Sequence, residues 1–194
     1  MVEWLAAILR GPAIESMVMV GIGRILEILI LLVVGLWAEP DGLKALGILP
    51  ARFRQGLFRG LLWSIGFGLV VLLAAVALKL AGMNPVSLIS ANLPQSKASL
   101  LLFFLVGGLI SPVAEEIFFR GVLYGYFRRW GVGAAVGGST LLFVLAHSAS
   151  RGVPLPQIVG GLLFAIAYEK EKNLLVPVTI HVLGNLAIFS VSLL

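Results

Sequence analysis

The sequence predicts an all-α fold: a polytopic transmembrane helical bundle with about six membrane-spanning helices. The first observation is composition, because 60% of the 194 residues are hydrophobic and only 12% are charged, about half the charged share of a typical soluble domain. The second is a mean hydropathy of +1.08. The third is that the apolar residues gather into stretches of roughly 20, the length of a helix that crosses a bilayer.

Six apolar stretches set the order of the expected helices. They cover residues 16–37, 58–81, 99–126, 132–149, 154–169 and 174–193. The third stretch is long and contains Pro112, which lacks the N–H that an internal helical position donates. We therefore expect this helix to tilt, kink or break near Pro112, with neighbouring helices satisfying the carbonyl that loses its donor.

Composition also excludes several classes of function. The sequence has no cysteine, which excludes a structural disulfide, a thiolate nucleophile and a thiolate metal site. Its 14 Lys and Arg against 9 Asp and Glu give a net charge of +5. In a membrane protein we interpret this excess as a topology signal rather than as a nucleic-acid surface. The sequence has no nucleic-acid motif and no phosphate-binding loop, so no nucleic-acid partner is expected.

Three short polar patterns lie inside the apolar stretches of the C-terminal half. They are Glu115-Glu116-x-x-x-Arg120, Phe143-x-x-x-His147 and His181-x-x-x-Asn185. An ionisable side chain inside a membrane is costly and usually marks a function. One such residue is often a helix-packing group hydrogen-bonded across an interface. The gathering of several on three of the six stretches instead predicts a shared functional site.

The residue inventory removes several ways of hydrolysing a bond in this setting. The only aspartate is Asp41, in an expected loop, so a two-aspartate protease is not available. The sequence lacks His-Glu-x-x-His, the usual helical zinc-protease pattern. Gly137-Gly138-Ser139-Thr140 faintly resembles a serine intramembrane protease, but small residues in a glycine-rich helix have a simpler role in helix packing. What remains is carboxylates, two imidazoles and an amide.

Helix geometry suggests how the first pattern divides. Glu116 and Arg120 are four residues apart, so they share a face and can pair, as a structural support for the site. Glu115 points about 100° away from Glu116 and is expected to face a different cavity, where it acts chemically. Arg24 and Glu27 in the first stretch are three residues apart, and we interpret them as another structural pair.

The other two patterns supply the remaining groups for hydrolysis by activated water. His147 can share the work of a general base with Glu115. His181 and Asn185 are four residues apart and can both donate hydrogen bonds to the oxyanion of a tetrahedral intermediate. Phe143 is expected to pack beside them and support the site.

Taken together, the three patterns resemble the motifs of the CAAX-processing and bacteriocin-processing (CPBP or Abi) intramembrane proteases, which include the type II CAAX prenyl endopeptidases. The resemblance covers about residues 99–194. It implies a hydrolase of the glutamic type, a CAAX protease-like peptidase without a cofactor. Its catalytic residues would be Glu115 and His147, which activate water, and His181 and Asn185, which form an oxyanion hole.

Two alternatives stay open beside the glutamic peptidase. A zinc-dependent metalloprotease would use Glu115, His147 and His181 as metal ligands. A non-enzymatic membrane scaffold, immunity protein or transport helper would use the same polar cluster without chemistry, since intramembrane ionisable residues also mark transport paths.

The predicted organisation is a single integral membrane domain over residues 1–194. The N-terminal helices of the bundle lie in 1–98 and the catalytic core, with its three motifs, in 99–194. The expected partners are the lipid bilayer and a membrane-associated protein or peptide substrate. The expected location is the inner (plasma) membrane of a prokaryote, crossed several times. Substrate identity and oligomeric state stay open.

Overall fold

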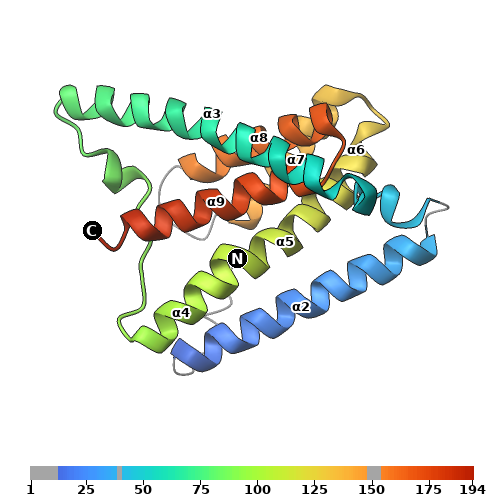
Figure 1. Ribbon diagram of the computed structural model, residues 1–194, viewed down its shortest axis with the longest axis horizontal. Coiled ribbons are helices and arrows are strands. Elements are labelled where there is room, and N and C mark those ends of the chain that lie inside the picture. The colour runs from blue at the N-terminus through green and yellow to red at the C-terminus, as the bar shows by residue number, and fades with distance from the viewer. Residues whose placement is uncertain (1–12, 39–40, 148–153) are drawn as a thin grey trace.

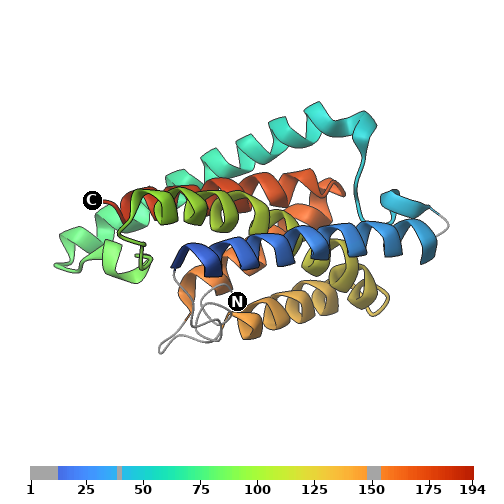
Figure 2. The ribbon, with the colours of Figure 1, turned by 90° about the horizontal axis from the view of Figure 1, so that it is seen from below.

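The protein is an elongated bundle of helices. The computed structural model describes residues 13–38, 41–147 and 154–194, and within these ranges the regular structure is entirely helical. Six helices follow one another in the described part of the chain, most of them along the long axis of the molecule (Figures 1 and 2). The predicted all-α membrane bundle is confirmed. The end of the fourth expected stretch, residues 148 and 149, lies outside the described residues.

The N-terminal half contributes two long helices. The elements are α2 (Ala13–Ala38), two short 3-10 turns η1 (Gly42–Lys44) and η2 (Pro50–Arg52), α3 (Phe53–Leu80) and a third turn η3 (Pro85–Leu88). The second helix begins at Phe53 rather than near residue 58, because the apolar signal is interrupted there by arginines that a helix end tolerates.

The third expected helix is continuous but changes its winding twice. Its segments are α4 (Lys97–Leu105), the π-helical η4 (Val106–Ile110), α5 (Ser111–Glu116), the π-helical η5 (Ile117–Tyr124) and α6 (Gly125–Arg128). Pro112 has no N–H to donate into the preceding turn. Gly107 in that turn instead accepts a hydrogen bond of 2.9 Å from the Asn185 amide. The expected compensation by a neighbouring helix is therefore present.

Three helices complete the bundle: α7 (Val132–Ala146), α8 (Leu155–Glu171) and α9 (Leu175–Val191). Among the described residues three helical stretches are long and apolar enough to cross a membrane, namely Ile14–Ala38, Pro50–Leu80 and Lys97–Arg128, and α7 and α9 are shorter apolar helices. The chain is an integral membrane protein. The count of six crossings stays a prediction.

Glycines set the closest approach between α3 and α9, which cross in Figure 1. A Cβ added at Gly56 would lie 2.6 Å from the Asn173 side chain, and one added at Gly60 would lie 2.6 Å from Thr179 Cβ. Larger residues would push the helices apart. Small residues at such contacts are typical of helix packing in membranes, and this contact holds the helix that carries His181 in place.

Candidate active site

The ionisable residues of the three polar patterns meet in one cluster, which is buried except at His147, whose side chain is 18% exposed. Glu115 and Glu116 end α5, Arg120 lies in η5, His147 follows α7 and His181 is on α9. Glu116 and Arg120 have no exposed surface, and Glu115 is 4% exposed. Because unpaired buried charges are strongly unfavourable, the pairing of these groups is what makes the cluster possible.

The two oxygens of Glu115 have different surroundings. Oε1 accepts a hydrogen bond of 2.8 Å from Nη2 of Arg24. Oε2 lies 3.6 Å from Nε2 of His147 and 3.8 Å from Nε2 of His181. One oxygen is therefore held by a guanidinium while the other faces two imidazoles.

Hydrogen bonds on the far side of each imidazole define its orientation. Nδ1 of His147 lies 2.8 Å from the Phe143 carbonyl oxygen, which only accepts, so Nδ1 carries the proton. Nδ1 of His181 lies 2.7 Å from Oε1 of Glu116, and an ionised carboxylate likewise only accepts. Both rings therefore turn Nε2 toward Glu115.

Glu116 and Arg120 form the predicted pair, with Nη1 donating to Oε1 at 2.9 Å. Nη2 of Arg120 donates to the Gly161 carbonyl of α8 at 3.1 Å. Glu115 and Glu116 point in different directions, yet His181 contacts Glu116 through Nδ1 and lies beside Glu115 through Nε2. A single ring joins the two carboxylates despite their different directions on the helix.

Aromatic rings enclose the charged groups. Phe143 lies 4.4 Å from His147 and 5.8 Å from His181, measured between ring centroids, as expected for a supporting residue. Phe164 stacks on His181 at 4.6 Å with an interplanar angle of 23°. Sequence reasoning missed Phe164, because a phenylalanine in an apolar helix carries no signal that separates it from ordinary packing.

Asn185 lies one turn beyond His181 on α9. Its amide donates to the Gly107 carbonyl of η4, so the structure places it against the π-helical turn before Pro112 rather than in direct contact with the imidazoles. One hydrogen of the amide is used in this bond and the other remains. Segments of π-helix are frequent at functional sites, and this one brings the amide next to the helix that carries Glu115.

Arg24 has a second partner that the sequence did not reveal. Its expected pair with Glu27 is present, with Nη1 to Oε2 at 2.6 Å. The pair is not isolated, however, because the same guanidinium reaches Glu115. An arginine in the middle of an apolar helix is expected to face the bundle interior, but spacing within one helix indicates only Glu27 as its partner.

Ser139, the candidate serine nucleophile, has a structural role in its own helix. Ser139 is fully buried, and its hydroxyl donates to the Ala135 carbonyl of its own helix at 2.7 Å. The neighbouring Gly138 packs against the Phe127 ring, where an added Cβ would lie 3.0 Å away. Both residues serve the contact between helices, as expected from the sequence.

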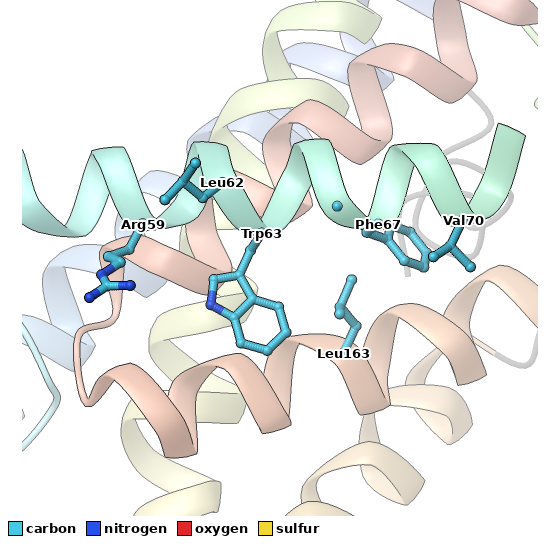
Figure 3. Close-up of a pocket in the computed structure, with 7 residues that line it drawn as sticks. Arg59, Leu62, Trp63, Phe67, Val70 and Leu163 are labelled. Atoms are coloured by element: carbon cyan, nitrogen blue, oxygen red, sulfur yellow. The ribbon is translucent and has the colours of Figure 1, made fainter.

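An apolar groove of about 430 Å³ opens between α3 and α8. Figure 3 shows Trp63 of α3 and Leu163 of α8 projecting into it, with Arg59 at one end. Leu163 directly precedes Phe164, the ring stacked on His181, and Trp63 packs against the apolar cluster that contains Phe164. The groove therefore runs beside the wall of the polar cluster.

The zinc alternative requires Glu115, His147 and His181 to converge on one ion. Within residues 13–38, 41–147 and 154–194, no group of three or more metal-ligating side chains forms. A guanidinium already occupies Oε1 of Glu115, and a divalent cation beside it would be repelled. The arrangement does not fit a resident zinc ion.

The C-terminal half of the chain, which carries the polar cluster, matches a known protein family. Residues 97–187 match the family model described as type II CAAX prenyl endopeptidase Rce1-like. Over these residues the chain is similar to this family of CAAX proteases. The matched residues include Glu115, His147, His181 and Asn185 but not Arg24.

Several curated proteins are similar to this chain. The membrane-embedded CAAX protease MroQ of Staphylococcus aureus (strain USA300) is 30% identical over 135 residues, 63% of this chain and 54% of that protein. An uncharacterized 24.3 kDa protein of Escherichia coli is 29% identical over 129 residues, 63% of this chain and 59% of that protein. The chain thus spans about half the length of these relatives. No solved structure matches it.

Proposed function

We propose that the protein is a glutamic-type intramembrane endopeptidase. It hydrolyses a peptide bond of a membrane-associated protein or peptide with water activated by Glu115 and His147. The observation that carries this proposal is that Oε2 of Glu115 lies opposite Nε2 of both histidines inside a bundle of apolar helices. The family match and the similarity to a protein named as a CAAX protease support it.

The first step uses the space between Glu115 and His147. Their facing atoms are 3.6 Å apart, so a water molecule beside that line can hydrogen-bond to both at about 2.8 Å. The carboxylate or the imidazole takes a proton from this water as its oxygen attacks the carbonyl carbon of the substrate. The same proton then passes to the leaving amine when the peptide C–N bond breaks.

The negative charge that develops on the carbonyl oxygen needs hydrogen-bond donors. In this mechanism His181 donates from Nε2 while Nδ1 donates to Glu116, which requires an imidazolium. The remaining amide hydrogen of Asn185 is the second donor.

The groove between α3 and α8 is the route that we assign to the apolar part of the substrate. Apart from Arg59 at one end, its lining side chains are apolar. Two of them, Trp63 and Leu163, pack against the cluster that contains Phe164, the ring that stacks on His181. A polypeptide held in the bilayer can reach such a groove sideways, without entering water. The site of action would be the plasma membrane of a prokaryote, and the reaction needs no cofactor.

The test compares cells that express the wild-type protein with cells that express Glu115→Gln at equal levels. Quantitative mass spectrometry of protein N-termini in isolated membranes would show new N-termini only with the wild-type protein. The polypeptides that carry these new N-termini are the candidate substrates. Identical sets of N-termini in the two strains would overturn the proposal and favour the scaffold or transport alternative.

A further inference from the structure

Arg24 brings a charge from the first helix into a cluster whose other members come from the third helix, α7 and α9. The side chain is 4% exposed, and its two terminal nitrogens reach two carboxylates. Nη2 donates to Oε1 of Glu115 at 2.8 Å and Nη1 donates to Oε2 of Glu27 at 2.6 Å. Arg24 and Glu115 are 91 residues apart in the chain, so the contact exists only in the folded bundle.

Close packing of α2 against the third helix places the Arg24 guanidinium beside Glu115. Gly21 lies one turn before Arg24, and a Cβ added there would lie 3.1 Å from Val106 of η4. Val106 is itself buried. In Figures 1 and 2, α2 runs alongside the third helix, and the two contact each other through α4, η4 and α5. This contact lies in η4, on the same continuous helix as Glu115 and N-terminal to it.

The contact determines which oxygen of Glu115 is available. A charge-assisted bond to one carboxylate oxygen fixes the rotation of the carboxyl group. With Oε1 on Arg24, Oε2 lies toward His147 and His181. The fork of an arginine can hold two carboxylates at once, which the single ammonium of a lysine does less well, and Glu27 thereby fixes the guanidinium from the other side.

We propose that Arg24 is a positioning residue for Glu115: it holds one carboxylate oxygen so that the other faces the two histidines. The inference rests on the proposed peptidase function and adds to it a residue from outside the segment that matches the family. Arg24 acts through Glu115 and does not touch the reacting atoms. Its loss is therefore expected to lower turnover rather than substrate binding.

The experiment uses the full chain in lipid nanodiscs and, as substrate, a polypeptide whose new N-terminus depends on Glu115. Arg24→Met, Arg24→Lys and Glu27→Gln are compared for kcat and KM, with the folded fraction measured by thermal unfolding. Arg24→Met is expected to lower kcat roughly 100-fold, because a small misplacement of a catalytic group costs about that much, with KM within about twofold. Arg24→Lys is expected to recover part of the loss. Glu27→Gln, which keeps the contact to Glu115, should lose much less.

Arg24→Met also removes the guanidinium that pairs with Glu27. If this single variant does not fold, the double variant Arg24→Met with Glu27→Gln replaces it, because it removes both charges of that pair. A wild-type kcat per folded molecule in Arg24→Met, or in the double variant if that is the one that folds, would overturn the inference while leaving Glu115 as the catalytic residue. A rise in KM alone would overturn it as well. If Glu115→Gln itself cleaves like the wild-type protein, the proposed function fails instead, and the two failures are thereby distinguished.

Discussion

Nδ1 of His181 lies 2.7 Å from Oε1 of Glu116, and this contact ties the supporting pair to the groups that we propose to be catalytic. Glu116 also accepts from Arg120 through the same oxygen. The Glu116 carboxylate therefore sets the direction of one imidazole while a buried guanidinium balances its charge. A residue that helix geometry predicted as merely structural orients a ring of the proposed oxyanion hole.

Arg120→Met is expected to destabilise the protein by about 3–5 kcal/mol, because it leaves a fully buried carboxylate without its guanidinium. The double variant Glu116→Gln with Arg120→Met removes both charges and should be less destabilised than the single one. Free energies of unfolding in detergent provide the measurement, and the double-mutant cycle gives the coupling. Equal destabilisation by the single and double variants would argue against a buried ion pair at this position.

Asn185→Asp keeps the size of the side chain but removes the amide hydrogens that donate to the Gly107 carbonyl and, as proposed, to the oxyanion. We expect kcat to fall by roughly 10²–10³, the usual effect of losing one oxyanion donor, with little change in KM. Steady-state kinetics of the purified variant check this. A change confined to KM would assign Asn185 to substrate binding instead.

Gly60→Ala should disturb the contact between α3 and α9, since its Cβ would lie 2.6 Å from Thr179 Cβ. A loss of about 1–3 kcal/mol in unfolding free energy is expected, as for overpacking of a tight contact. Gly68→Ala on the same helix is the matched control, because an added Cβ there meets nothing within 4 Å and alanine favours a helix. Equal stability of the two variants would contradict the packing account.

Filling the groove should weaken substrate binding without touching the polar cluster. Val70→Trp places a large ring among the lining residues, and Val71→Trp places the same ring at an exposed position next to it that does not line the groove. We expect a KM several-fold higher for Val70→Trp only. If the two variants have the same KM, the substrate uses another route.

Treatment with a metal chelator is expected to leave the activity unchanged, because Arg24 already holds one oxygen of Glu115 and the described residues form no metal-ligating group. The measurement is the rate of cleavage before and after dialysis against the chelator. Loss of activity that zinc alone restores would move the mechanism to the metalloprotease alternative.

The sequence predicted those features that depend on local spacing. Apolar stretches of membrane length gave the order of the helices, and the four-residue spacing predicted the pair of Glu116 and Arg120 that the structure contains. The presence of ionisable residues on three apolar stretches was enough to predict that they meet.

Features that arise from packing between distant helices were not predictable in the same way. The contact of Arg24 with Glu115 depends on how α2 lies against the third helix, which no spacing within one helix reports. The stacking of Phe164 on His181 involves an apolar residue among many. Two π-helical turns interrupt the third helix, whereas the sequence indicated only a disturbance near Pro112.

The central claim is that Glu115 activates the hydrolytic water, and the most direct test is the turnover number of purified Glu115→Gln on the polypeptide that the wild-type protein cleaves. Glutamine keeps the size of the side chain but cannot take up the proton. The account predicts that cleavage falls to background while the variant unfolds at a temperature close to that of the wild-type protein. A folded Glu115→Gln that cleaves at the wild-type rate would contradict it.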